Sequence, residues 1–339
     1  QLDPNRAVVR HVAVREPGNY RGIVDNRLLT TDVKSMIGDR RMDILVEVAG
    51  GIEPMRSIMA EAMTAGIDVT SANKAAIAGS ELINHSIDMQ VGFRFAAAVG
   101  GSTNFLGYII DRSRVDEVES ITAIVNGTTN FVLGEMEQGQ EFNEVLPEAI
   151  KLGFAEAEHQ ADTEGHDHVR KLAIVSGLAF GKLIDPELIS RRGMLEITPF
   201  DLEFARQYQA DEEKPGFVVK HLAMARKLKD GSLYLRVTPA LISADDDLAR
   251  VNREFNGFEV VWKYAGRQFL SGKGAGGIPT AVAVMEDIDR LIQNRRNGVV
   301  DELPRLDPNV QIAEQGADKE KSVDIRRPDG TSITLPIAE

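Results

Sequence analysis

The residues best suited to chemistry lie in one charged segment near the middle of the chain, GFAEAEHQADTEGHDHVRKLAIVSG. Within it, Asp167 and Lys171 stand four residues apart at the start of an otherwise apolar helix, so both side chains lie on one helical face. A carboxylate and an ammonium group held together where a helix becomes buried can transfer a proton to or from a bound substrate. The same spacing is also typical of a surface salt bridge, with the acid favoured by the helix dipole.

Three histidines in this segment, His159, His166 and His168, raise the question of a metal site. Their spacings of seven and two residues match no dedicated ligand pattern. The chain contains no cysteine, which excludes disulfides, thiolate metal sites and a thiol nucleophile. We therefore expect no zinc site here.

Two further segments could contact a ligand. Lys74 lies in VTSANKAAIAG, where a predicted strand ends and a helix begins, and ligands of parallel sheets bind at this edge. A lysine there could meet an anionic group or a reacting oxygen, although lysines at helix starts are common on surfaces. The glycines of GKGAGG, residues 272–277, would let a ligand approach the backbone, or they form only a tight turn.

The elements that must position these residues differ between the two parts of the chain. In the first third, β-branched runs over 8–14, 44–48 and 67–70 alternate with helical patterns over 53–65 and from Lys74. This alternation predicts βαβ units in a parallel sheet, an α/β fold of the doubly wound Rossmann type.

The edge of that sheet is where we expect a nucleotide. The run RMDILVEVAGG predicts a buried strand ending in a glycine pair, which puts Ala49 and Gly50 at the ligand-binding edge. The G-x-G-x-x-G turn that opens a nucleotide domain is absent, and the chain opens at a presumed second strand ending at Arg15. A strand-turn-helix unit of about 25 to 40 residues is missing. The sequence is therefore either a fragment or a protein that has lost part of its cofactor site.

The rest of the chain predicts an α+β domain, with helices in FNEVLPEAIKLG and from Asp167 to Gly181, and strands in LYLRVTPALIS and FEVVWKYAGRQFLSG. We expect a nucleotide-binding domain over 1–91, incomplete at its N-terminus, and an α+β substrate-binding and dimerisation domain over 92–277. A helix over 278–300 would return to the first domain, and 301–339 would form a polar tail with a PDG hairpin turn.

Charge and hydropathy exclude several classes of protein. Thirty-nine Lys and Arg against fifty-two Asp and Glu give a net charge of -13, with no basic stripe that could follow a phosphate backbone. We expect no nucleic-acid partner. The chain opens without the apolar core of a signal peptide and contains no apolar run of membrane-spanning length. A protein of the cytoplasm, not associated with a membrane, is the expectation.

Five segments, taken in order, are similar to homoserine dehydrogenases: TSANKAAIA, AAAVGG, NGTTNFVLGEME, KLGFAEAEHQADTEGHDHVRKLAIVSGLAFG and SGKGAGGIPTAVAV. The resemblance runs from about residue 7 to residue 293, most of the chain. It implies an oxidoreductase that interconverts homoserine and aspartate semialdehyde. It also implies NAD or NADP in the first domain, an amino-acid substrate in the second, and a homodimer formed through the second domain's sheet.

The resemblance also assigns roles by position. Lys171 resembles the family's catalytic proton donor and acceptor, with Asp167 beside the substrate hydroxyl and Lys74 touching both cofactor and substrate. Glu156 resembles the acid that receives the substrate's ammonium group. Further substrate contacts are Asp162, Gly127 and Thr128, and the cofactor contacts are Ala49, Gly50, Lys74, Gly274 and Gly276. Arg15 is placed to meet a 2′-phosphate, which favours NADP over NAD.

Two departures from the family pattern affect the expected sodium site and the hydrogen-bond donors near the substrate carboxylate. Ala96 stands where the family commonly has a glutamate heading a sodium-binding loop, so Val99, Gly101 and Thr103 would form at most a weak sodium site. Phe154 stands where many members have tyrosine, which removes a hydroxyl donor near the substrate carboxylate. Two alternatives stay open: a related oxidoreductase for another small amino alcohol, and a catalytically silent binding protein.

Overall fold

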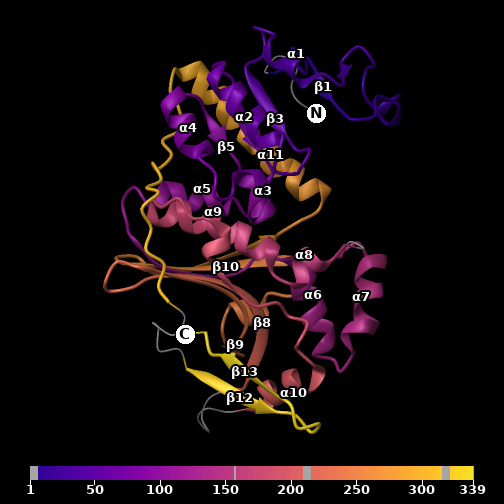
Figure 1. Cartoon of the computed structure of the whole chain (residues 1–339), viewed down its shortest axis with the longest axis vertical. Coiled ribbons are helices and arrows are strands. Elements are labelled where there is room, and N and C mark those ends of the chain that lie inside the picture. The colour runs from indigo at the N-terminus through magenta and orange to yellow at the C-terminus, as the bar shows by residue number, and fades with distance from the viewer. Residues whose placement is uncertain (1–6, 156–157, 209–214, 315–320, 339) are drawn as a thin grey trace. The chain divides into compact units, whose positions relative to one another are not determined.

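The computed structural model describes residues 7–155, 158–208, 215–314 and 321–338 (Figure 1). The chain divides into two compact units. The first contains residues 7–77, 81–95 and 284–303, and the second contains 78–80, the described part of 96–283, and 304–338 apart from 315–320. None of the described helices combines the length and apolar character needed to cross a membrane.

The first unit is built on a parallel sheet of three strands in the order β3-β4-β5. Its central strand β4 is buried along its whole length, as expected for a parallel strand covered on both faces. Helix α2 buries Met59, Ala62 and Met63, which are spaced by three and one residues and therefore lie on one helical face. The elements of this unit are β1 (Val12–Ala13), η1 (Pro17–Tyr20), β2 (Leu29–Thr30), α1 (Val33–Ile37), β3 (Ile44–Glu47), α2 (Met55–Thr64), β4 (Asp68–Ser71), α3 (Lys74–Ile77), α4 (Leu82–Met89) and β5 (Phe93–Arg94).

The first predicted strand differs from the structure. Instead of a strand over 8–14, the structure has only β1, and it pairs with β2 in a separate parallel sheet of two strands. Hydrogen bonds to Leu28 and Thr30 carbonyls hold it there. Its β-branched composition predicted an extended backbone correctly but could not specify the pairing partner, which is a non-local property.

Helix α11 (Gly277–Asn297) has its second half in the first unit. Leu291 is fully buried against Gly92, where an added Cβ would lie 2.4 Å from the leucine Cδ2. Asp287, 2% exposed, accepts from the Arg94 guanidinium at 3.0 Å and from the Thr70 hydroxyl at 3.3 Å. The end of this helix is therefore fixed to β4 and β5 by both packing and a buried ion pair.

The second unit is built on a six-stranded sheet in the order β11-β10-β6-β8-β9-β7. Its neighbouring strands are antiparallel except for β7, which runs parallel to β9. Helices α6, α9 and α10 pack on β8, and α6 and α7 lie side by side (Figure 1). The remaining elements are η2 (Ala96–Ala98), η3 (Gly101–Thr103), α5 (Phe105–Arg112), β6 (Val118–Ile124), α6 (Gly127–Met136), α7 (Phe142–Lys151), α8 (Gln160–Thr163), α9 (His166–Phe180), η4 (Pro186–Leu188), β7 (Ser190–Arg191), α10 (Pro199–Gln207), β8 (Phe217–Lys227), β9 (Leu233–Ser243), η5 (Leu248–Arg250), β10 (Phe255–Trp262), β11 (Gly266–Lys273), β12 (Ser322–Arg326) and β13 (Ser332–Pro336).

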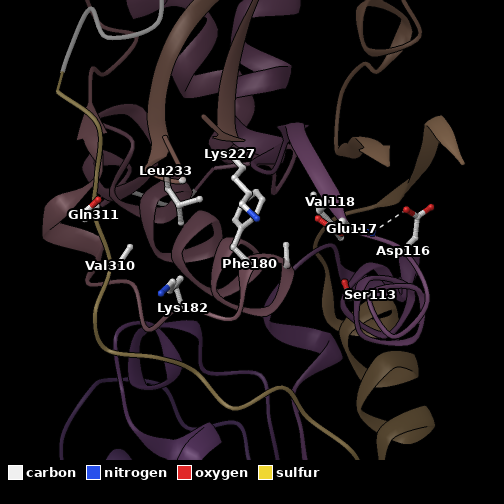
Figure 2. Close-up of a pocket in the computed structure, with 12 residues that line it drawn as sticks. Ser113, Asp116, Glu117, Val118, Phe180, Lys182, Lys227, Leu233, Val310 and Gln311 are labelled. Atoms are coloured by element: carbon white, nitrogen blue, oxygen red, sulfur yellow. Dashed lines mark hydrogen bonds between the residues drawn. The ribbon is translucent and has the colours of Figure 1, made fainter. Parts of the chain in front are cut away.

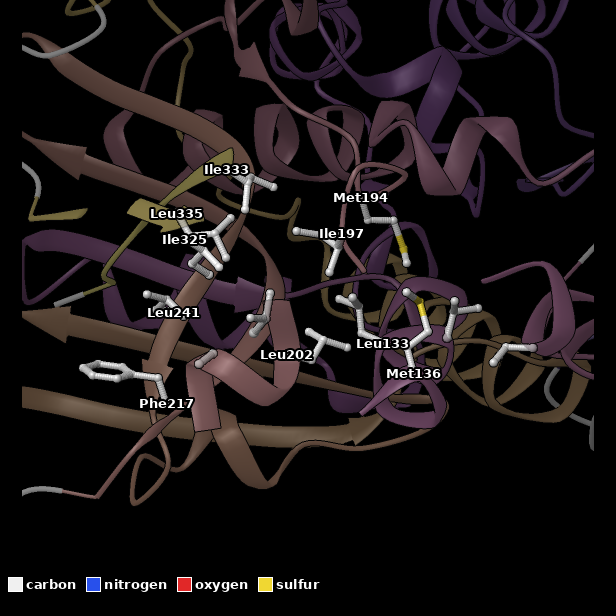
Figure 3. Close-up of a cluster of buried hydrophobic side chains, with 14 of the residues drawn as sticks. Leu133, Met136, Met194, Ile197, Leu202, Phe217, Leu241, Ile325, Ile333 and Leu335 are labelled. Atoms are coloured by element: carbon white, nitrogen blue, oxygen red, sulfur yellow. The ribbon is translucent and has the colours of Figure 1, made fainter. Parts of the chain in front are cut away.

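The C-terminal segment is part of the second unit's core, which corrects its description as a polar tail. β12 and β13 form an antiparallel hairpin around the expected PDG turn. Figure 3 shows Ile325, Ile333 and Leu335 in the same buried cluster as Leu241 of β9. Apolar side chains recur at every second position of each strand, so one face of the hairpin is apolar although the segment as a whole is polar.

Candidate active site

The charged pair singled out in the sequence is buried near the start of α9. Lys171 Nζ lies 2.7 Å from Asp167 Oδ2, and the two side chains are only 9% and 5% exposed. The surface salt-bridge interpretation is therefore wrong. Asp167 lies in the first turn of α9, where the helix dipole stabilises a carboxylate. Lys171, one turn later, also donates to the Val125 carbonyl at 2.5 Å.

Asn126 connects this pair to the NGTT segment at the start of α6. Its Nδ2 donates to Asp167 Oδ2 at 2.9 Å and to Asp162 Oδ1 at 2.7 Å. Its Oδ1 accepts from the Thr129 amide at 2.9 Å, which caps α6. One buried amide therefore orients two of the predicted site carboxylates. Sequence reasoning missed Asn126, although an asparagine directly before a helix start is a recognisable capping signal.

Gly127 and Thr128 begin α6 beside this cluster. Thr128 Oγ1 donates to the Phe154 carbonyl at 2.6 Å. An added Cβ on Gly127 would lie 3.2 Å from Glu254 Cα, so a larger residue would push this turn away. Five of the predicted site residues therefore lie in one region of the second unit: Asp162, Asp167, Lys171, Gly127 and Thr128. Glu156, predicted to bind the substrate ammonium, lies outside the described residues.

Gly274 packs against the same region from the end of β11. Its amide donates to the Glu254 carbonyl at 3.2 Å, and an added Cβ would lie 2.0 Å from Asn256 Oδ1. Asn256 Nδ2 in turn donates to the Val125 carbonyl that Lys171 also contacts. Gly276 has φ 114°, which favours glycine. Gly274 is therefore required by close packing next to the Lys171 cluster.

The residues expected to form a sodium loop lie in η2, η3 and the turn between them. Gly100 and Gly101 have positive φ, and an added Cβ on Gly101 would lie 2.5 Å from the Lys273 carbonyl. Thr103 Oγ1 donates to the Gly100 carbonyl at 2.9 Å. Ala96 and Val99 are buried apolar residues. Among the described residues, no group of three or more acidic or histidine side chains is arranged to hold a metal ion.

In the first unit, three of the four predicted cofactor contacts, Ala49, Gly50 and Lys74, lie at the carboxyl ends of β3 and β4. Asn73 Nδ2 donates to the Gly51 carbonyl at 2.6 Å, and its Oδ1 accepts from the Ala76 amide, so it joins the start of α3 to the turn after β3. Lys74 is the first residue of α3 and is half-buried. Ala49 and Gly50 are exposed in that turn. Arg15 is exposed after β1, which is not a strand of this sheet.

Glu47 organises this edge and was not predicted. Its carboxylate is 4% exposed and accepts from the Ala49 and Gly50 amides at 2.9 and 3.2 Å and from the Ser71 hydroxyl at 2.7 Å. A cofactor here would therefore meet the exposed surface of the turn and not these two amides. An acid inside the apolar run ILVEV, directly before a glycine pair, is the sequence signal that could have identified it.

A cavity of about 340 Å³ in the second unit lies elsewhere (Figure 2). Its lining includes Val118 at the beginning of β6, Phe180 at the end of α9 and Lys227 at the end of β8. Phe180 follows Lys171 by nine residues, a rise of roughly 13 Å along the helix. None of the predicted site residues lines this cavity.

Two buried histidines, His168 and His221, pack against each other, with ring centroids 4.1 Å apart and ring planes tilted by 36°. His168 Nε2 lies 3.3 Å from Thr129 Oγ1, and His221 Nε2 lies 3.0 Å from the Arg192 carbonyl. The pKa of His221 is lowered from 6.5 to about 4, mainly by burial. The hydrogen bond to the Arg192 carbonyl opposes this shift, and the charge of Arg191 adds to it. His221 is therefore neutral at pH 7.

This depressed pKa predicts a loss of stability in acid. The unfolded chain binds the proton at higher pH than the folded chain, so the stabilisation is complete above about pH 6.5 and is lost as pH falls towards 4. Between pH 7.5 and 4.5 the loss from His221 alone should be roughly 2 to 3 kcal/mol. Urea unfolding of wild type and His221→Gln at both pH values measures it. Glutamine keeps a donor for Arg192, and an equal loss in both proteins would contradict the prediction.

Both parts of the chain are similar to known proteins. Residues 5–90 match the family model described as the NAD binding domain of homoserine dehydrogenase, and residues 106–288 match the model described as homoserine dehydrogenase. A curated homoserine dehydrogenase of Corynebacterium glutamicum is 37% identical over 86% of this chain and 65% of its own length. One of Synechocystis is 35% identical over 91% of this chain and 70% of its own length. The crystal structure of a homoserine dehydrogenase from Thiobacillus denitrificans superposes with a TM-score of 0.84 at 30% identity, covering 91% of this chain and 72% of that one.

The parallel sheet of the first unit and its match to an NAD-binding model define the class as an α/β protein with a Rossmann-type nucleotide-binding domain. The second unit's match covers more than half of the chain. The chain therefore belongs to the homoserine dehydrogenase family. It spans just under two thirds of the Corynebacterium relative's length.

Proposed function

We propose that this protein interconverts L-homoserine and L-aspartate 4-semialdehyde with a nicotinamide cofactor. The observation that carries the proposal is the buried Lys171–Asp167 pair, joined through Asn126 to the start of α6. Homoserine presents an ammonium, a carboxylate and a terminal hydroxyl, and each needs a partner of matching charge or polarity. For the hydroxyl end of homoserine, the second unit offers the Lys171 ammonium together with the Asp167 and Asp162 carboxylates. Partners for the substrate's ammonium and carboxylate groups are proposed from membership of the family.

In this proposal, Lys171 handles the proton of the substrate hydroxyl. During oxidation the hydroxyl oxygen loses its proton, and in the reverse direction the Lys171 ammonium neutralises the alkoxide that forms. Asp167 Oδ2 lies 2.7 Å from Nζ and holds it in place. Asp162 is oriented by the same amide as Asp167, and Glu156 would receive the ammonium group.

The first unit's sheet edge fits a nicotinamide dinucleotide, which supplies the hydride chemistry when bound. Added Cβ atoms on Gly50 and Gly51 would meet nothing within 4 Å, and both residues have positive φ, so this turn is open to a close ligand. Ala49, Gly50 and Lys74 would contact the cofactor from this edge. Gly274 and Gly276 are further proposed cofactor contacts, which rest on the family resemblance alone. Arg15 favours NADP, because a guanidinium can pair with the 2′-phosphate.

Initial rates with aspartate semialdehyde test the proposal, with NADPH and NADH assayed in parallel. We expect turnover with both cofactors and a higher kcat/KM with NADPH than with NADH. Arg15→Asp should lower kcat/KM with NADPH but not with NADH. Each ion pair with the 2′-phosphate contributes roughly 1.5 to 3 kcal/mol, so the selectivity change should be at least about tenfold. Absence of turnover would favour a silent binding protein. A higher kcat/KM for another short amino alcohol would move the assignment to the related oxidoreductase.

We also propose that the protein is a homodimer formed through the six-stranded sheet of the second unit. Support comes from the family's mode of assembly and from β11, an edge strand whose outer side has no paired strand among the described residues. Sedimentation velocity should give twice the chain's mass, and a monomer at micromolar concentration would contradict this assembly.

A further inference from the structure

The turn over residues 251–254, between η5 and β10, carries an arginine in an unusual backbone conformation. Arg253 has φ 59°, in the left-handed region that residues other than glycine seldom adopt. This conformation is unfavourable for an arginine by itself, and it persists only where the surrounding structure holds it. An arginine in this conformation, where glycine would be favoured, is a candidate for a functional role of its side chain.

Two buried side chains hold this turn. Lys220 of β8, 1% exposed, donates through Nζ to the Val251 carbonyl at 2.9 Å and to Asn252 Oδ1 at 3.2 Å. It also lies 3.3 Å from Asn130 Oδ1 of α6, and Asn130 Nδ2 donates to the Arg253 carbonyl at 3.1 Å. Burial lowers the pKa of Lys220, and the charge of Glu137 opposes that shift. The turn and α6 are therefore fixed to each other.

This anchoring places Arg253 at the proposed substrate site. Its guanidinium lies 6.0 Å from the centre of the Phe154 ring, and the Phe154 carbonyl accepts from Thr128 Oγ1. The next residue, Glu254, packs directly on Gly127. Two proposed substrate contacts therefore adjoin this region: Gly127 lies next to the backbone of the turn, and Thr128 bonds to Phe154, whose ring Arg253 contacts.

The charge of Arg253 is available to a ligand. Its side chain is exposed, and no carboxylate of the described residues forms an ion pair with it. The adjacent acid, Glu254, instead lies 3.6 Å from Lys273. The guanidinium also lies 6.0 Å from the Phe131 ring, so two aromatic faces restrict its orientation. An arginine oriented in this way can bind a carboxylate with two parallel hydrogen bonds.

We propose that Arg253 binds the α-carboxylate of the amino-acid substrate and thereby selects substrates that carry one. This inference rests on the proposed function, because it concerns the end of homoserine opposite the hydroxyl at Lys171. The phenyl ring of Phe154 has no hydroxyl to donate to that carboxylate, and the Arg253 guanidinium beside it supplies donors and a full positive charge.

Steady-state kinetics with Arg253→Gly, Arg253→Lys and Arg250→Ala test the proposal. Glycine adopts the φ of this position without strain, so Arg253→Gly should fold normally. We expect it to raise the KM for homoserine and for aspartate semialdehyde roughly 10- to 100-fold, with a much smaller change in kcat. Arg253→Lys should recover part of the loss. Arg250→Ala, which removes an equivalent charge three residues away, should leave KM unchanged.

A decarboxylated analogue separates carboxylate binding from a structural effect. 3-Aminopropan-1-ol lacks the carboxylate, so its inhibition constant against homoserine should be the same for wild type and Arg253→Gly. A variant that weakens both compounds equally would show a structural role and overturn the proposal. An active wild type with an unchanged KM in Arg253→Gly would overturn this inference alone, whereas an inactive wild type would overturn the proposed function and this inference with it.

Discussion

Replacing Lys171 by methionine should lower kcat for homoserine oxidation about a thousandfold, within the roughly 10²- to 10⁴-fold range for loss of a positioned proton-transfer group. The Lys171 ammonium is held between Asp167 and the Val125 carbonyl, 2.7 and 2.5 Å away, and methionine can neither donate nor accept its proton. The KM for homoserine should change far less than kcat. Initial rates of NADP⁺ reduction over a range of homoserine concentrations measure both.

Controls must separate catalysis from folding. Removing Lys171 alone deprives a buried carboxylate of its cationic neighbour, which costs roughly 3 kcal/mol or more of stability. The double variant Lys171→Met/Asp167→Asn removes both charges and should fold better while remaining inactive. Lys182→Met removes a more exposed lysine, 2.5 Å from Asp307, and should keep near wild-type kcat. A folded Lys171→Met protein with normal kcat would contradict the catalytic assignment.

Replacing Arg327 by methionine should destabilise the second unit by roughly 3 to 5 kcal/mol, the usual cost of removing one partner from a buried ion pair. Asp201, on α10, is fully buried, and its oxygens lie 3.0 Å from Arg327 Nε and 2.7 Å from Nη2. The Asp201 carboxylate raises the pKa of Arg327, so the guanidinium keeps its positive charge. Urea unfolding followed by the fluorescence of Trp262, the chain's single tryptophan, reports on this unit.

Arg326 is the matched control for this prediction, because it precedes Arg327 in the same hairpin but is exposed. Arg326→Met should shift the unfolding midpoint little. The double variant Arg327→Met/Asp201→Asn should recover part of the loss, since it no longer buries an uncompensated charge. Equal midpoints for Arg326→Met and Arg327→Met would show that the hairpin contributes little to the unit's stability.

Local sequence by itself determined much of this protein. The pairing of Asp167 with Lys171 follows from the helical period, and the end of α9 follows from Gly181, whose φ is 64°. β3 and β4 follow from β-branched runs between glycine-rich turns, and the order of five motifs identified the family. These features depend on residues near one another in the chain, so periodicity and propensity are sufficient to predict them.

Only the tertiary structure decided what those residues contact. The burial of the Lys171 pair depends on Asn126 and Val125, more than forty residues earlier in the chain, and Asp201 and Arg327 are separated by 126 residues. The pairing of β1 with β2 and the left-handed conformation of Arg253 are likewise set by distant partners. Local composition cannot specify such partners, because burial and long-range hydrogen bonds exist only once the chain has brought distant segments together.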